Sequence, residues 1–270
     1  MTIFLRLSFT FAFAVLIVTS SSLSSVPAAQ ALDVSKATII DLTHPIDANT
    51  IYWPTETKTF QLDEVHKGVT ERGFFYASYR FCSPEHGGTH VDAPFHFAEH
   101  GQTAAAIPID RLSGPAVVID VSAKAAEDTD YTLSAQDVSD WEHAHGKIPD
   151  GAIVLLRTGW SSRWPDKRAY LGDDTPGDAS NLHFPSYGPE AARVLVDRGV
   201  AVLGVDTASI DNGPSKDFLV HRIAGAANVV GLENVTNLDQ LPATGAWAIV
   251  LPMKIAKGSG APARAIALVP

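Results

Sequence analysis

Short apolar runs rich in β-branched residues recur along most of the chain, and Gly, Pro or Asp bounds nearly all of them. Runs of this length and composition predict strands rather than helices. The predicted strands are 37–42, 73–81, 115–121, 151–156, 200–205, 228–232, 246–251 and 263–269. Between them, residues 161–187 are rich in Ser, Asp, Gly and Pro and predict a long loop that could cover a site.

Helices with well-marked ends are fewer. Ser134 can cap a helix over 135–145, and Pro189 occupies the first turn of a helix over 190–198, each followed by a glycine. A third helix is predicted to begin near Ser215. Many strands with few helices predict a single α/β domain with a mixed sheet, whose strand order the sequence leaves open.

The first 31 residues follow a different pattern. Residues 1–6 precede an apolar stretch over 11–18, a Ser-rich segment and an A-x-A sequence at 29–31. This is the order of a secretory signal peptide with its cleavage site. A membrane anchor is the alternative, but the apolar core is shorter than the ~20 residues that a spanning helix needs. We therefore expect removal of residues 1–31 and a secreted or periplasmic domain, 32–270, without stable membrane insertion.

The composition limits the classes of molecule that the protein could bind. The formal net charge is -10 and no basic run is present, so the sequence offers nothing to a phosphate backbone and predicts no nucleic-acid partner. Cys82 is the only cysteine, which makes an internal disulfide impossible. A small-molecule substrate is the predicted partner.

Ligand-capable side chains are densest between residues 85 and 97. His86, His90, Asp92 and His96 fall within eleven residues, among glycines and a proline that disfavour a helix. A tight loop would let the first three converge on one ion, with His96 approaching from the following segment. Imidazole mixed with carboxylate suits Zn²⁺ or Mn²⁺. A solvated loop or buried structural histidines would explain a lone histidine, but they explain this density less well.

The run from His86 to Phe97, His-Gly-Gly-Thr-His-Val-Asp-Ala-Pro-Phe-His-Phe, resembles the signature of the metal-dependent cyclase superfamily, which includes bacterial kynurenine formamidase (arylformamidase) and isatin hydrolase. Residues 41–46 and 52–54 look like the family's opening segment, and 204–211 look like its Asp-Thr-x-Ser-x-Asp strand end. The resemblance covers most of residues 37–270. It implies a swivelling β/β/α fold with a barrel-like core and peripheral helices, in a homo-oligomer of two or four chains.

The resemblance also implies the ligands of a metal centre. His86, His90 and Asp92 would hold one ion, with Asp92 bridging, and His221 and Glu233 would serve a second. Glu233 follows a buried-looking strand, where an unpaired carboxylate would be costly, although a surface position at a strand end is the alternative. Isatin hydrolases, as the resemblance implies, have glutamine there and use one ion. Glu233 therefore favours the two-ion, formamidase-like arrangement.

His96 matches the family's general acid/base, and Trp53 matches an aromatic residue of its substrate pocket. The sequence therefore predicts a metal-dependent amidohydrolase, which cleaves an amide-type C–N bond of an arylformamide or cyclic amide with metal-activated water. Two alternatives remain: an isatin hydrolase-like or lactone-hydrolysing enzyme with a single ion, and a catalytically silent metal-dependent binding protein. Kynurenine formamidases are expected in the cytosol, so the predicted signal peptide departs from their pattern.

Several aromatic residues lie near the histidine run in the sequence and leave two interpretations open. They would suit a flat aromatic ligand, but aromatic residues on a strand pack in a core more often. They are Trp53, Phe74, Phe75, Tyr76 and Phe97. Ser209 and Asp211 are expected to orient metal ligands rather than to act as nucleophiles.

Overall fold

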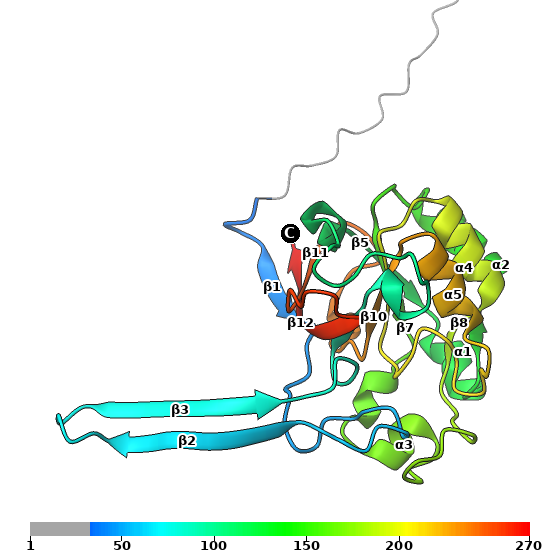
Figure 1. Cartoon of the computed structure of the whole chain (residues 1–270). Helices are drawn as coiled ribbons and strands as arrows, with labels where there is room; N and C mark the ends of the chain where they lie inside the picture. The colour runs from blue at the N-terminus through cyan, green and yellow to red at the C-terminus, as the bar shows by residue number, and fades with distance from the viewer. Residues whose placement is uncertain (1–32) are drawn as a thin grey trace, which may run out of the picture. The chain divides into compact units, whose positions relative to one another are not determined.

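In the computed structural model, which describes residues 33–270, eight strands form one sheet and seven of them close into a barrel. The barrel closes because β12 pairs with both β11 and β4, while β1 (Thr38–Asp41) joins outside along β12 (Figure 1). Around the barrel the order is β12 (Gly260–Val269), β11 (Trp247–Pro252), β5 (Ser113–Asp120), β7 (Ile153–Arg157), β9 (Val202–Val205), β10 (Val230–Glu233) and β4 (His90–Asp92). The predicted α/β class and barrel-like core are therefore confirmed.

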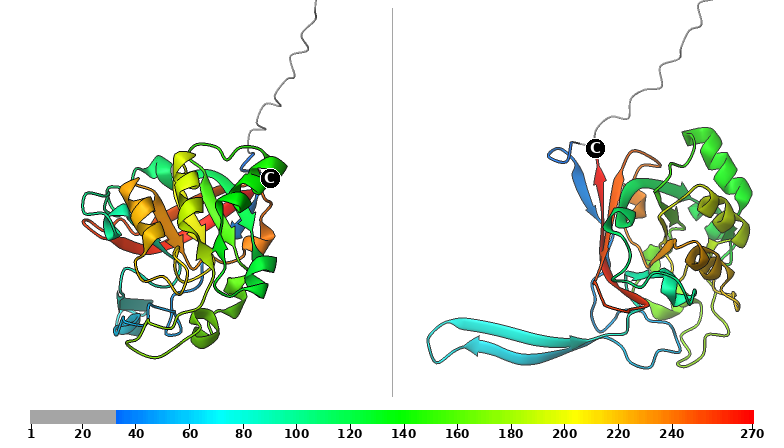
Figure 2. Two further views of the ribbon diagram at one scale, coloured as in Figure 1. Left: turned by 90° about the vertical axis from the view of Figure 1, so that its right-hand side faces the viewer. Right: turned by 45° about the horizontal axis from the view of Figure 1, so that its top comes forward.

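Strands β5, β7, β9 and β10 are parallel and buried on both faces. Side chains such as Val118 and Leu155 fill the barrel, whereas the alternate residues Val154 and Leu203 pack against the helices outside. This double burial explains why the strands appear as continuous apolar runs in the sequence. The covering helices are α2 (Ala135–His145), α4 (Pro189–Asp197) and α5 (Leu219–Ala226) (Figures 1 and 2).

Both helices with marked ends have the predicted bounds to within a residue. Ser134 accepts a hydrogen bond from the Asp137 N–H, and the Asp137 carboxylate accepts one from the Ser134 N–H, which completes a capping box at α2. Pro189 lies at the first turn of α4. The third helix begins at Leu219, later than predicted, because residues 212–218 form turns and bends.

The predicted strand 73–81 corresponds to β3 (Phe75–Cys82), but its environment differs from the expected core. It pairs with β2 (Gln61–Val69), which the sequence analysis did not predict, in a hairpin that extends from the barrel (Figure 1). Phe74, Phe75 and Tyr76 lie at its far end and are 54%, 64% and 50% exposed. These three aromatic residues therefore belong neither to the core nor to a ligand pocket.

The predicted long loop over 161–187 is wrong for much of its length. This segment contains most of a 3-10 turn, η3 (Trp160–Arg163), together with α3 (Lys167–Leu171) and β8 (Ser186–Tyr187). Tyr170 and Phe184 are fully buried, because the segment packs its own small apolar cluster beside the barrel. The remaining elements are η1 (Pro94–His96), η2 (Ile109–Leu112), α1 (Ser122–Glu127), β6 (Thr132–Leu133) and η4 (Leu238–Gln240).

Among the described residues, none of the helices has both the length and the apolar character needed to span a bilayer. The predicted signal peptide, residues 1–31, lies outside the described residues.

Candidate metal centre and substrate pocket

Strand register brings the candidate ligands to one end of the barrel. His90 and Asp92 are alternate residues of β4, so both side chains point to the same face. In the antiparallel pairing of β4 with β10, Glu233 lies directly opposite His90. The sequence predicts a loop over the whole histidine run, but the middle of the run is a strand because β10 and β12 pair with it on either side.

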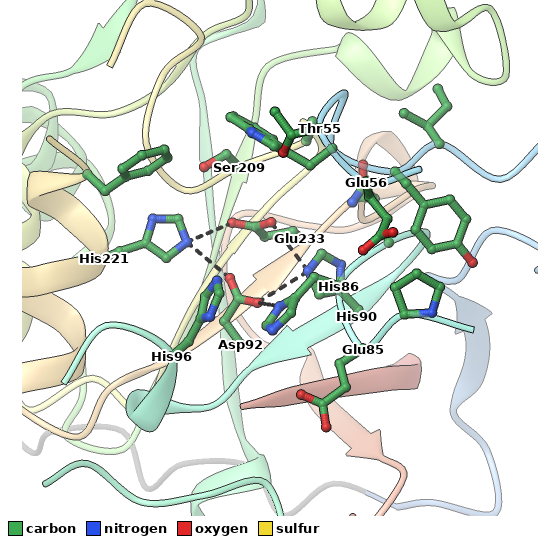
Figure 3. A pocket seen from close by; sticks show the side chains of 18 of the residues that line it. Thr55, Glu56, Glu85, His86, His90, Asp92, His96, Ser209, His221 and Glu233 are labelled. Atoms are coloured by element: carbon green, nitrogen blue, oxygen red, sulfur yellow. Dashed lines mark hydrogen bonds and ion pairs between the residues drawn. The ribbon is translucent and has the colours of Figure 1, made fainter. Parts of the chain in front are cut away.

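The two carboxylates lie between the imidazoles (Figure 3). One oxygen of Asp92, Oδ1, is 2.5 Å from His86 Nδ1 and 3.2 Å from His90 Nε2, and the other, Oδ2, is 3.0 Å from His221 Nε2. Glu233 is placed in the same way, with Oε2 3.5 Å from His90 Nε2 and Oε1 3.2 Å from His221 Nε2. The structure thus brings together all five predicted metal ligands.

The outward nitrogen of each imidazole has a partner of its own. His90 donates from Nδ1 to the carbonyl of Gly88 at 2.9 Å, and His221 donates from Nδ1 to Asp211 at 2.7 Å. Gly88 has a φ of +59°, a conformation that glycine adopts without strain. Because the single proton of a neutral imidazole is used in these outward bonds, each Nε2 presents a lone pair to the carboxylates.

His86 is oriented by residues that the sequence analysis did not assign. The Ser259 hydroxyl donates to Glu85 at 2.6 Å, which leaves its oxygen to accept from His86 Nε2 at 2.9 Å. Nδ1 of His86 then faces Asp92 without a proton. Glu85 directly precedes the histidine run and could have been considered, but Ser259 is 173 residues from His86 and carries no local signal.

The Nε2 or Nδ1 lone pairs of the three imidazoles and the oxygens of the two carboxylates face one another with no hydrogen-bond donor between them. Such a cluster of acceptors is stable only when a positive charge lies among them. In the metal-free chain, protons fill that role: burial lowers the pKa of His90, but the charge of Asp92 outweighs it and raises the pKa to about 9. Burial and the charge of Asp92 raise the pKa of Glu233. A divalent ion supplies the same positive charge without protonating the ligands, so these residues fit a metal centre.

His96 lies beside this centre, and it lines the cavity described below. Its ring stacks on His86 at 3.9 Å between centroids and meets Phe97 edge-on at 4.5 Å. The surrounding protein displaces water from the imidazole and lowers the pKa of His96 to about 4, although the residue as a whole remains exposed. His96 is therefore neutral at pH 7 and able to accept a proton. His96 also has a ligand atom within 4.8 Å of those of His86 and Asp92, so geometry alone permits it to bind metal.

A cavity of about 490 Å³ opens above the ligands, within the usual size for small-molecule sites. Trp53 and Phe97 line it, as does Phe218, which the sequence analysis did not assign to the site. Phe218 lies against both of the other rings, with its ring centroid 6.0 Å from that of Trp53 and 5.3 Å from that of Phe97. Aromatic rings thus form one side of the cavity, and the candidate metal ligands lie at its bottom. None of residues 161–187 lines this cavity, so the predicted cover is not there.

Asp211 has the expected orienting position. Its carboxylate accepts hydrogen bonds from the backbone N–H groups of Val220 and His221, as well as from the His221 ring. Ser209 lines the cavity, and its hydroxyl accepts from the Asp211 N–H at 3.2 Å. Asp211 therefore fixes both the ring and the backbone of His221.

Comparisons with known proteins agree with this geometry. Residues 40–212 match the family model described as putative cyclase. The chain is 35% identical to an isatin hydrolase of Roseibium aggregatum, over 86% of this chain and 92% of that one. It is 28% identical to a kynurenine formamidase of Salinibacter ruber, over 84% and 96%. A solved isatin hydrolase bound to the product analogue thioisatinate superposes with a TM-score of 0.78 at 32% identity, covering 87% of this chain and 94% of that one.

Proposed function

The chain belongs to the putative cyclase family, and from this premise we propose that it is a metal-dependent hydrolase of an amide-type C–N bond in a small molecule. One observation supports this chemistry above all. Three imidazole nitrogens and two carboxylates converge beneath an aromatic cavity, and none of these groups, with the imidazoles neutral and the carboxylates ionised, places a hydrogen-bond donor between them. A binding protein would not need a neutral imidazole, His96, beside such a centre.

We propose that two ions bind per chain, Zn²⁺ or Mn²⁺. His86, His90 and Asp92 would hold one ion, His221 and Glu233 would serve the other, and Asp92 would be shared between them. When bound, a divalent ion lowers the pKa of water towards ~7 and polarises a carbonyl group.

His96 would move the proton. Its neutral ring takes the proton of the attacking water as the C–O bond forms, and returns it to the nitrogen as the C–N bond breaks. Trp53, Phe97 and Phe218 would hold a flat substrate and exclude bulk water from this step. Asp211 and Ser259 keep the imidazoles of His221 and His86 in the required tautomers.

The substrate is proposed as an arylformamide or a cyclic amide. The similarity to isatin hydrolases favours opening of a cyclic amide. Glu233 favours the formamidase-like arrangement, since the family resemblance implies glutamine at this position in isatin hydrolases. Both reactions need the same water activation and the same proton carrier.

We further propose export of the chain, on the signal-like pattern of residues 1–31, and assembly as a homo-oligomer.

Metal loading combined with a panel of substrates tests the proposed metal-dependent hydrolysis and the proposed number of ions. Chelator-stripped protein would be titrated with Zn²⁺ or Mn²⁺, its metal content measured by mass spectrometry, and hydrolysis of N-formylkynurenine, isatin and a simple lactone followed by absorbance. We expect two ions per chain and metal-dependent turnover of one of the first two compounds. Saturation at one ion would overturn the two-ion centre. Tight binding of a compound without turnover of any would favour the binding protein.

A further inference from the structure

The cavity above the candidate ligands has an excess of negative charge in its lining. Two acidic residues other than the candidate ligands line it, Glu56 and Glu85 (Figure 3). None of the described residues that line it is Lys or Arg. Within the described part of the chain, no Lys or Arg side chain forms an ion pair with Glu56 or Glu85. The charge of these two carboxylates is therefore not neutralised by a basic side chain.

Glu56 is held beside an aromatic ring of the cavity by a tight turn. Its N–H donates to the carbonyl of Trp53 at 2.9 Å, and its Oε1 accepts from the N–H of Lys58 at 2.9 Å. Glu56 is exposed and also lines the cavity, so it lies where the cavity meets solvent. Burial raises the pKa of Tyr52, another lining residue, and the charge of Glu56 adds to this rise. The field of the Glu56 carboxylate therefore reaches the lining of the cavity.

Glu85 adds a second negative charge to the cavity. Its Oε2 accepts from the backbone N–H of Ser259 at 2.9 Å and from the Ser259 hydroxyl at 2.6 Å. These two donors orient the carboxylate but carry no formal charge, so they leave its negative charge in place. Glu85 is half-buried, and solvent ions screen its field less than they screen the field of the exposed Glu56.

The aromatic rings of the cavity are a second, independent feature that favours cations. The face of an aromatic ring attracts positive charge, and tryptophan does so most strongly. The rings of Trp53 and Phe218 both line the cavity, with centroids 6.0 Å apart. Because the turn ties Glu56 to Trp53, a positively charged group near the Trp53 ring also lies near a carboxylate.

The two ends of the cavity thus favour opposite charges in a ligand. The bottom, where the candidate ligands lie, suits the electron-rich oxygen of a carbonyl group once a cation is bound there. The opening, beside Glu56, suits a positive group. A carboxylate at the opening would face Glu56 with no Lys or Arg in the described lining to offset the repulsion.

We propose that Glu56 is a specificity-determining residue which, together with Trp53 and Glu85, selects aryl amides that carry a positively charged group and rejects those that carry a carboxylate in the same position. This selection deepens the amide hydrolysis proposed above and rests on it for the bond that is cleaved. It concerns the part of the substrate that does not react, so it applies equally to arylformamides and to cyclic amides.

Ligands of equal shape isolate the effect of charge on binding. The compounds para-(trimethylammoniomethyl)acetophenone and para-neopentylacetophenone have nearly the same shape and differ by one permanent positive charge. Each is a ketone without a C–N bond at its carbonyl, so neither is hydrolysed. Calorimetric titration of the metal-loaded chain measures both Kd values. We expect the charged ligand to bind about 3- to 10-fold more tightly, and we expect added salt to reduce this ratio.

Glu56→Gln removes the charge but keeps an oxygen that can accept from the Lys58 N–H. It should lower the ratio of the two Kd values by about 2- to 5-fold. Glu71→Gln is the matched control, since Glu71 is exposed in the turn of the β2–β3 hairpin and does not line the cavity. This control removes the same formal charge from the chain and should leave the ratio as it is. Circular dichroism would check the folding of both variants.

The corresponding formanilides test the same selection in turnover. We expect kcat/KM to be highest for the para-trimethylammoniomethyl compound, lower for the para-neopentyl compound and lowest for the para-carboxymethyl compound. The quantity kcat/KM is used because unproductive binding of the carboxylate to a metal ion cancels in it.

Equal Kd values for the two ketones, or a ratio that Glu56→Gln leaves unchanged, would overturn the charge selection while hydrolysis of the formanilides could still stand. A ratio that Glu71→Gln lowers as much as Glu56→Gln does would also overturn it, because the overall charge of the chain would then be the cause. Hydrolysis of none of the formanilides, with the expected ratio of Kd values, would contradict the proposed hydrolysis of arylformamides and support the charge selection.

Discussion

The histidine run and the β2–β3 hairpin are adjacent in the sequence, yet their environments are opposite. His90 and Asp92 lie on a strand with partners on both sides and are buried, whereas Phe75 and Phe81 lie on a strand with one partner and are exposed. In the histidine run, two carboxylates lie close together in a buried site, which is electrostatically costly. On the hairpin, aromatic rings are exposed to water. A bound cation would balance the charge of the converging carboxylates.

The largest expected effect comes from removing the charge shared by the whole metal centre. Asp92→Asn should abolish metal binding and lower turnover by about 10³-fold or more, because Asp92 faces three imidazoles. Asp63→Asn on the hairpin, where the carboxylate has only the exposed Arg80 as a partner, should change neither. Metal content and steady-state kinetics of both variants measure the contrast. Equal losses in the two variants would mean that the hairpin and the centre are not separate.

His96→Ala should lower kcat by about 10²- to 10⁴-fold and leave metal content unchanged, since a proton carrier contributes on this scale. The corresponding change on the hairpin, His66→Ala, should be silent. Loss of an ion from His96→Ala would instead make His96 a ligand, which its position beside His86 and Asp92 permits.

Asp211→Asn should weaken metal binding by about 10- to 100-fold, because the His221 ring loses its charged acceptor while every direct ligand stays in place. Titration with a competing chelator measures this affinity. Glu64→Gln, on the hairpin, serves as the control. Metal affinity unchanged in Asp211→Asn would remove the orienting role of Asp211.

The smallest effect is a dependence of stability on pH. In the metal-free chain the pKa of His90 is raised from 6.5 to about 9. The stabilisation is therefore complete below pH 6.5 and is lost as the pH rises through 9. The Tm of the metal-free chain should fall over this interval, whereas the metal-loaded chain should not fall, because deprotonated ligands bind metal better. Parallel falls in both forms would show that the protons of the centre are not replaced by metal.

The local sequence pattern was enough to predict the positions of many of the barrel strands. The apolar runs at 151–156 and 200–205 became β7 and β9, since strands buried on both faces must be apolar throughout. The capping residues at Ser134 and Pro189 predicted two helix starts, because a cap is a contact within a few residues. The order of the strands could not be predicted, since pairings such as β12 with β4 join residues far apart in the chain.

The histidine run illustrates the same division within one site. Spacing and family resemblance predicted His86, His90, Asp92, His221 and Glu233, and the structure places them in one cluster. The contribution of Ser259 could not be predicted, because a serine is common and its contact with His86 exists only after the barrel closes. Phe218 was missed for a similar reason, since its place in the pocket depends on the turn before α5.

The sequence by itself determined which strands are buried and where two helices start, and it singled out the candidate metal ligands and the candidate proton carrier of this protein. Only the tertiary structure decided where each aromatic residue stands. Trp53 and Phe97 line the pocket, whereas Phe75 and Tyr76, which are also aromatic and closer to His86 in the sequence than Trp53 is, lie on an exposed hairpin. The physical reason is that ligand chemistry belongs to the side chain, whereas burial depends on which distant segments pack against it.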